Sequence, residues 1–189
     1  NSSAASDVYK RQLVGMGLKV AIFPLHFWLP NAYTYAPSAV TAFLAATATK
    51  VAVYVLLRFI FSVFQPAFLA ETSTLEIIFY PFALLAMFAA SATAIFQRDL
   101  KRMLAYSSIA QIGYMLLGVA LLSETGLMAT ILHLFNHGIT KAALFMGVGA
   151  YALRSKSSFY IDLQGLGKTM PWTSAAVIIG GISLIGVPG

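Results

Sequence analysis

The chain has 189 residues, of which 59% are hydrophobic and only 10% are charged, and its mean hydropathy is +0.81. A soluble domain carries about 25% charged residues, so this composition predicts a membrane protein. The absence of cysteine excludes disulfide scaffolds, iron–sulfur clusters and cysteine nucleophiles. The net charge of +6 is dispersed along the chain, so we expect the lipid bilayer as a partner and no nucleic acid.

The first twelve residues, NSSAASDVYKRQ, are polar and are followed abruptly by an apolar run. Their charges do not precede an apolar core in the order of a signal peptide. We therefore expect 1–12 to be a non-native tail outside the fold. The sequence also stops within an apolar run, so 13–189 are expected to form a partial transmembrane domain that is truncated at both ends.

The rest of the chain contains six apolar stretches. Each complete stretch approaches the ~20 residues that a helix needs to cross a bilayer, and none has the short alternating pattern of membrane barrel strands. The sequence therefore predicts an all-α fold, a polytopic transmembrane bundle of about six helices. The stretches cover 13–29, 36–64, 77–97, 103–122, 126–153 and a last run that begins after Pro171.

Two prolines fall within the first stretch. Pro24 cannot donate a backbone hydrogen bond to the carbonyl of Val20, so we expect the first helix to be interrupted there. Pro30 is expected to end this helix and, if the helix continues that far, to free the carbonyl of His26 in the same way. Between them, Trp28 is interpreted as an anchor at the membrane interface.

Basic residues are concentrated in two of the predicted loops, 98–102 and 154–170. The order of the helices places both loops on one face of the membrane. The opposite face has the loops 65–76 and 123–125, which contain no Lys or Arg. By the positive-inside rule, 98–102 and 154–170 are predicted to be cytoplasmic, in a multi-pass protein of a prokaryotic inner membrane. The six basic residues are Arg98, Lys101, Arg102, Arg154, Lys156 and Lys168.

Six ionisable side chains fall at mid-membrane positions of the predicted segments, and they include every histidine of the chain. A lysine at the centre of a spanning helix costs roughly 2.5–3.5 kcal/mol on insertion scales. All acidic residues lie in the polar tail or at predicted helix ends, so we expect a partner carboxylate on a helix outside this chain. The six side chains are Lys19, Lys50, Lys141, His26, His133 and His137.

Three of these residues, His133, His137 and Lys141, follow one another at intervals of four, which places them along one face of the fifth predicted helix. A neutral histidine can pass a proton between its two nitrogens, and a buried lysine can change its charge near neutral pH. The alternative is that the histidines only form hydrogen bonds with a neighbouring helix. The predicted proton relay comprises Lys19, Lys50, His133, His137, Lys141 and His26.

Two further classes of function compete with a relay. One is a haem-binding electron carrier in which His26 and either His133 or His137 are axial ligands, although no c-type attachment motif is present. The other is a purely structural subunit, in which the buried lysines could be replaced without loss of activity. The segment 165–168 lacks the upstream glycine of a phosphate-binding loop. We expect neither a metal nor a cofactor.

Four segments carry a resemblance to a known family. They resemble the antiporter-like subunits of respiratory complex I, the NADH-quinone oxidoreductase, and the D subunit of Mrp-type monovalent cation/proton antiporters. FPLHFWLPNAY and LFNHGITKAALF favour the Mrp branch, with complex I and membrane-bound hydrogenases as alternatives. The segments are KVAIFPLHFWLPNAYTYAPSAVTAFLAATATKVAVYVLLR (19–58), FQRDLKRMLAYSSIAQIGYMLLG (96–118), HLFNHGITKAALF (133–145) and GLGKTMPWT with SLIGVPG (165–189).

The resemblance implies a fold of about fourteen transmembrane helices, of which this chain would supply the central part. It implies that Lys19 pairs with a glutamate on an upstream helix and that Lys50 is a bridging lysine. It also implies that His133 and His137 relay protons and that Lys141 matches a lysine found in some branches. The implied subunit has no redox centre of its own, assembles with other membrane subunits, and moves protons and, in the antiporter branch, Na⁺ or K⁺.

Overall fold

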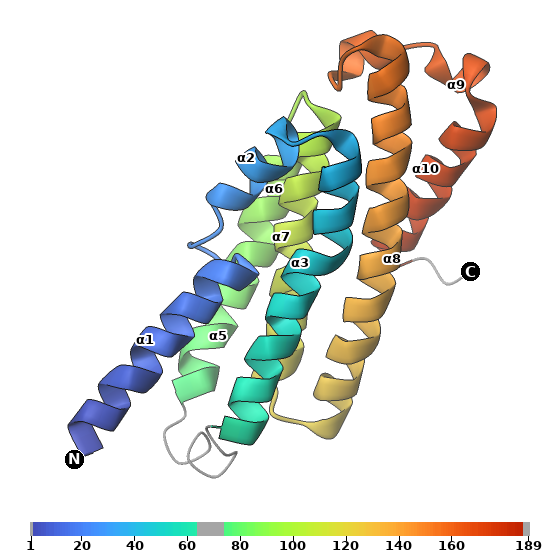
Figure 1. The fold of residues 1–189 in the computed structure, drawn as a ribbon. Coiled ribbons are helices and arrows are strands. Elements are labelled where there is room, and N and C mark those ends of the chain that lie inside the picture. The colour runs from blue at the N-terminus through green and yellow to red at the C-terminus, as the bar shows by residue number, and fades with distance from the viewer. Residues whose placement is uncertain (1, 64–73, 187–189) are drawn as a thin grey trace.

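The computed structural model describes residues 2–63 and 74–186. Within these ranges the chain is helical apart from short connections, which confirms the predicted all-α bundle (Figure 1). All six apolar stretches become helical. The elements are α1 (Ser2–Val20), α2 (Trp28–Tyr35), α3 (Ser38–Arg58), a π-helical turn (Phe59–Val63), α5 (Thr74–Leu85), a second π-helical turn (Ala86–Ala90), α6 (Ser91–Ile95), α7 (Leu100–Ala120), α8 (Glu124–Ser155), a 3₁₀ turn (Tyr160–Leu163), α9 (Leu166–Thr169) and α10 (Pro171–Ile185).

The first stretch is interrupted at Pro24, as predicted. Helix α1 ends at Val20 and α2 begins at Trp28, with turns between them. The indole Nε1 of Trp28 donates to the carbonyl of Leu18 at 2.8 Å. Trp28 therefore joins the two halves of the broken helix, a role that its interpretation as a membrane anchor did not include. Figure 1 shows that α1 ends about half way along the bundle and that α2 occupies the upper half.

The prediction that Pro30 ends the first helix is wrong. Pro30 lies in the first turn of α2, where the missing N–H is not needed because the first turn of a helix leaves its N–H groups unpaired. The carbonyl of His26 is not free either, since it accepts a hydrogen bond from the N–H of Leu29 at 3.0 Å. Pro30 therefore helps to start the second half of the broken helix.

Helix α1 begins at Ser2, so the segment 1–12 continues directly into the first apolar helix. The assignment of this segment as a non-native tail stays a prediction.

The two basic loops lie together at one end of the bundle, uppermost in Figure 1. Two backbone hydrogen bonds, of 2.9 and 3.1 Å, join 98–100 to 158–160. The connection between α7 and α8 lies at the opposite end (Figure 1). Most of the predicted loop 65–76 lies outside the described residues. Both basic loops thus lie at the same end of the bundle, and the side of the membrane that this end faces stays a prediction.

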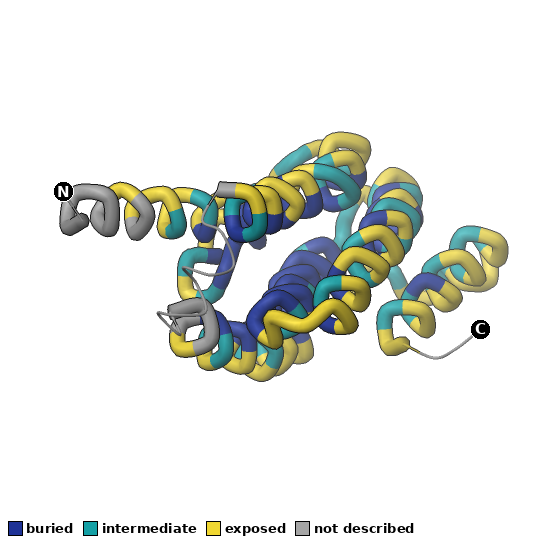
Figure 2. The backbone as a smooth tube through the Cα atoms, turned by 90° about the horizontal axis from the view of Figure 1, so that it is seen from below, coloured by how far each residue is buried: buried dark blue, intermediate teal, exposed yellow. Residues whose placement is uncertain are grey.

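Helix α8 is central to the half of the bundle that holds the histidines, because it packs against α3, α7 and α10. Buried apolar side chains form two clusters, one that includes Leu56 and Leu116 and another that includes Leu104 and Phe145. Figure 2 shows the buried residues on the inside of the bundle, while the helix nearest the C-terminus lies at the periphery and is mostly exposed. The second cluster surrounds the level at which the buried lysines lie.

Among the described residues, two helices are long and apolar enough to cross a membrane by length and composition, Ser38–Ser62 and Leu100–Ala120. Helix α8 is longer, with 32 residues, but it carries the row of histidine and lysine residues. The two apolar helices flank this row, since α3 and α7 both pack against α8.

Candidate functional site

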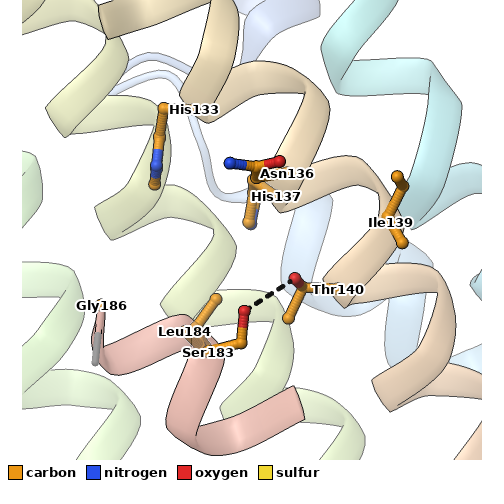
Figure 3. Close-up of a pocket in the computed structure, with 8 residues that line it drawn as sticks. All are labelled: His133, Asn136, His137, Ile139, Thr140, Ser183, Leu184 and Gly186. Atoms are coloured by element: carbon orange, nitrogen blue, oxygen red, sulfur yellow. Dashed lines mark hydrogen bonds between the residues drawn. The ribbon is translucent and has the colours of Figure 1, made fainter. Parts of the chain in front are cut away.

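The predicted row on α8 is present as a continuous line of polar groups. His137 and Lys141 are 2% and 0% exposed, and His133 is partly buried. The rings of His133 and His137 are stacked, with centroids 5.9 Å apart and an interplanar angle of 6°. Figure 3 shows both rings pointing the same way from α8. The spacing of four residues therefore produces the predicted line of titratable side chains.

Lys50 approaches this row from α3. Its side chain is 7% exposed, and its Nζ donates to the carbonyl of Ala45 and to Oγ1 of Thr49. Gly138 makes the approach possible, because a Cβ at this position would lie 3.8 Å from Cγ of Lys50 and 3.3 Å from the carbonyl oxygen of Ala46. The lysine stem thus lies against α8 at the residue that follows the second histidine.

The stem of Lys50, on the helix that packs most closely along α8, lies against Gly138, one residue after His137 and three before Lys141. The structure therefore brings together four of the six predicted relay residues. They come from two helices that are adjacent in space although more than 80 residues separate them in sequence. The sequence pattern on α8 did not contain this fourth member, Lys50; its predicted depth in the membrane and the family resemblance suggested it.

Lys141 is held by α7. Its Nζ donates to the carbonyl oxygen of Leu104 at 2.8 Å and to Oγ of Ser107 at 2.6 Å. The same carbonyl also accepts hydrogen bonds from the hydroxyls of Ser107 and Ser108, each at 3.0 Å. A fully buried amine is therefore surrounded by neutral oxygen atoms.

Neither buried amine forms an ion pair with a carboxylate in the described part of the chain. Buried polar groups are tolerated when they are hydrogen-bonded, and main-chain carbonyls and hydroxyls meet this need for Lys50 and Lys141. A partner carboxylate on another helix stays a prediction, but these two lysines do not need one to be hydrogen-bonded.

Three nitrogens of the two histidines on α8 are buried without a hydrogen-bond partner in the described structure: Nε2 of His133 and both ring nitrogens of His137. These side chains line a cavity of about 490 Å³ between α8 and the end of α10. A polar cavity of this size can hold water molecules, each of which needs two to four polar partners. Figure 3 shows its lining, which comprises His133, Asn136, His137, Ile139, Thr140, Ser183, Leu184 and Gly186.

Lys19 does not join this cluster. It lies in the last turn of α1 and is exposed in this chain, which corrects the expectation that it is buried with the other lysines. Its charge is not among those that act on His133, His137 or Lys141. The reason is that α1 packs on the far side of α3 from α8 (Figure 1).

His26 is also separate from the row. It is buried in the break between α1 and α2, where its ring stacks on Phe23 and Phe27 with centroid distances of 5.0 and 4.7 Å. Its Nδ1 has no hydrogen-bond partner among the described residues. No described contact links His26 to the α8 residues, so a relay through it stays a prediction.

Sequence reasoning missed the groups that hold the lysines. The Ser107–Ser108 pair gave the only local signal, two adjacent hydroxyls inside an apolar helix. Gly138 was visible as a small residue between His137 and Lys141. Neither pattern says which neighbouring helix it faces, because that depends on how helices pack rather than on sequence spacing.

With this geometry described, comparison with known proteins becomes informative. Residues 8–189 match the family described as NADH:quinone oxidoreductase/Mrp antiporter, transmembrane. The chain belongs to this family. It is a membrane protein of the antiporter-like group, as its composition and motifs predicted.

Two curated members of the antiporter-like group show the breadth of the similarity. The N subunit of the NADH-quinone oxidoreductase of Desulforudis audaxviator (strain MP104C) is 41% identical over 176 residues, which cover 93% of this chain and 35% of that protein. The D subunit of the Na⁺/H⁺ antiporter of Alkalihalophilus pseudofirmus is 36% identical over 178 residues, with coverage of 93% and 35%. The chain thus spans about a third of the length of these relatives.

A solved structure supports the same membership. A chain of the Mrp complex from Dietzia sp. DQ12-45-1b superposes with a TM-score of 0.85 and 34% sequence identity, over 93% of this chain and 32% of that chain. Both the helix arrangement and the sequence therefore place this antiporter-like segment within larger membrane proteins.

Proposed function

We propose that this chain is the central segment of a proton-translocating membrane subunit, of the same type as the D subunit of monovalent cation/proton antiporters. The observation that carries the proposal is the buried cluster of Lys50, His133, His137 and Lys141, in which two amines are held by neutral oxygens and two histidines face a cavity. Such intramembrane ionisable groups mark proton pathways in transporters.

The cluster has the chemistry of a relay. Two protonated amines in one buried site repel each other, so the arrival of a proton at Lys50 favours the release of another proton from Lys141. The unpartnered nitrogens of His133 and His137 can accept that proton and pass it on through ring tautomers. The cavity between α8 and α10 then provides room for water that connects the histidines to solvent.

A second candidate is an antiporter-like proton-pumping subunit of an NADH-quinone oxidoreductase. The 41% identity to an N subunit of that complex, compared with 36% to an antiporter D subunit, favours it. Both candidates use the same buried cluster. They differ in what drives the protons, a cation gradient in one and electron transfer in other subunits in the other. Membrane-bound hydrogenases provide a third setting for the same relay.

The proposal extends to location and partners. The complete protein would lie in a prokaryotic inner membrane with 98–102 and 154–170 in the cytoplasm, as the basic residues of these loops indicate. It would assemble with other membrane subunits and exchange protons for Na⁺ or K⁺. The exposed apolar faces of α1 and α10 support contacts with further helices in the membrane. Lys19, exposed at the end of α1, is available to pair with an acid on such a helix.

The test is a Lys50→Ala substitution in the complete protein that carries this segment. We expect proton transport into inverted vesicles, followed by a pH-sensitive dye, to fall at least tenfold, because a proton site of the cluster is lost. Arg58→Ala is the matched control, since Arg58 is an exposed cation at the end of the same helix. Transport at the wild-type rate in Lys50→Ala would contradict the relay.

A further inference from the structure

The contact between Lys141 and α7 is more specific than burial alone requires. The Nζ atom lies 2.6 Å from Oγ of Ser107, the shorter of its two hydrogen bonds. Hydrogen bonds to charged groups are shorter and stronger than neutral ones. The hydroxyl of Ser107 is thus a principal partner of the fully buried amine.

The second hydrogen bond of Ser107 fixes how this hydroxyl is oriented. Its proton is donated to the carbonyl of Leu104 at 3.0 Å. A serine hydroxyl has one proton and two acceptor lone pairs, so with the proton engaged on Leu104 the lone pairs face the Lys141 amine. In this arrangement Ser107 accepts from the amine and cannot donate to it. Ser107 therefore acts only as an acceptor toward the amine of Lys141.

The groups around Lys141 show what this hydrogen bond competes with. Lys50 on α3 and His137 on α8 are the titratable groups whose interactions reach it, and α10 contributes no charged side chain. Ser107, on the neighbouring helix α7, is a neutral partner of the same amine.

We propose that Ser107 is a positioning residue that holds the Lys141 amine on α7 and thereby sets the transfer of a proton between Lys141 and His137. The inference rests on the proposed function and deepens it by naming a neutral docking site for one relay group. Ser107 itself neither gains nor loses a proton. Its hydroxyl fixes the position of the Lys141 amine between proton transfers.

The adjacent serine provides a matched control. Ser108 is fully buried on the same helix and donates to the same carbonyl of Leu104 at 3.0 Å. It has no described contact with Lys141. A Ser108→Ala substitution therefore removes a hydroxyl and one hydrogen bond to Leu104, as Ser107→Ala does, but leaves the hydrogen bond between Ser107 and the Lys141 amine intact.

The first measurement is transport by the complete protein in inverted vesicles. We expect Ser107→Ala to lower the rate about tenfold, the equivalent of losing one hydrogen bond to a charged group. Ser108→Ala and the hydroxyl-preserving Ser107→Thr are expected to stay within about twofold of the wild type. Equal losses in Ser107→Ala and Ser108→Ala, or no rescue by Ser107→Thr, would overturn the positioning role.

The second measurement does not depend on transport. It is a double-mutant cycle of thermal unfolding with Ser107→Ala, Lys141→Met and the pair. We expect the pair to lower the melting temperature by clearly less than the sum of the single losses. Additive losses would overturn the contact. If the losses are coupled but the Lys50→Ala and Ser107→Ala proteins both transport protons normally, the proposed function fails. If Lys50→Ala abolishes transport and Ser107→Ala leaves it normal, only the positioning role fails.

Discussion

At the scale of single residues, the buried cations are held by main-chain and hydroxyl oxygens. Lys50 and Lys141 each reach a carbonyl oxygen together with a threonine or serine hydroxyl. These oxygen atoms accept hydrogen bonds from a protonated amine as water would. They lack the negative charge of a carboxylate, which would hold the proton on the amine. A neutral anchor is thus compatible with a lysine that must both accept and release a proton.

Gly138 is the residue through which the two helices bring their ionisable groups together. We expect Gly138→Val to separate α3 from α8, because even a Cβ would lie 3.3 Å from the carbonyl oxygen of Ala46. Overpacking of this kind costs about 1–3 kcal/mol. The thermal unfolding temperature and the transport rate of the complete protein should both fall.

The control for this substitution is Gly181→Ala on α10, where a Cβ would meet nothing within 4 Å. It should leave both measurements unchanged. A stable Gly138→Val protein that transports protons normally would show that close approach of Lys50 to α8 is unnecessary.

At the scale of the elements, the apolar stretches were predictable because helix length and hydropathy are local properties of the sequence. The break at Pro24 was predictable for the same reason. The role of Pro30 was not, since a proline can either end a helix or occupy the first turn of the next one. The choice depends on whether the chain resumes its helix, which α2 does by packing against α7.

The candidate site, too, was predictable from the sequence only in part. The row of His133, His137 and Lys141 followed from spacing along one helix. Its neutral partners on α7 and the approach of Lys50 did not, because they depend on which faces of separate helices meet. The expected carboxylate partner illustrates the difference. Composition showed that buried amines needed partners, but only packing showed that serine, threonine and carbonyl oxygens could provide them.

Asp99 joins the two basic loops and also caps a helix. Its carboxylate accepts from the N–H of Arg102 at 2.9 Å, as the N-cap of α7, and from the hydroxyl of Ser158. We expect Asp99→Ala to lower the stability of the complete protein by about 1 kcal/mol or more, because an N-cap and a second hydrogen bond are lost. Thermal unfolding of the purified protein measures this.

Asp162→Ala is the control for this prediction, since Asp162 is exposed in the second basic loop. Equal melting temperatures for Asp99→Ala and the wild type would show that the cap does not stabilise the bundle.

At the scale of the whole molecule, the two ends of the bundle differ in charge, and this difference predicts how the chain lies in the membrane. The end with the joined loops carries six basic residues, whereas the connection between α7 and α8 carries the acidic residue Glu124 and no basic residue. Basic loops are retained in the cytoplasm.

Thiol labelling tests this orientation directly, because the segment itself contains no cysteine. Lys156→Cys and Glu124→Cys replace exposed residues at opposite ends of the bundle. In the complete protein, with any cysteines elsewhere replaced, a membrane-impermeant maleimide should label Glu124→Cys in intact cells and Lys156→Cys only in inverted vesicles. The reverse pattern would place the basic loops outside and contradict the proposed orientation. Labelling of both positions from one side would contradict the helix order itself, since α8 alone connects them.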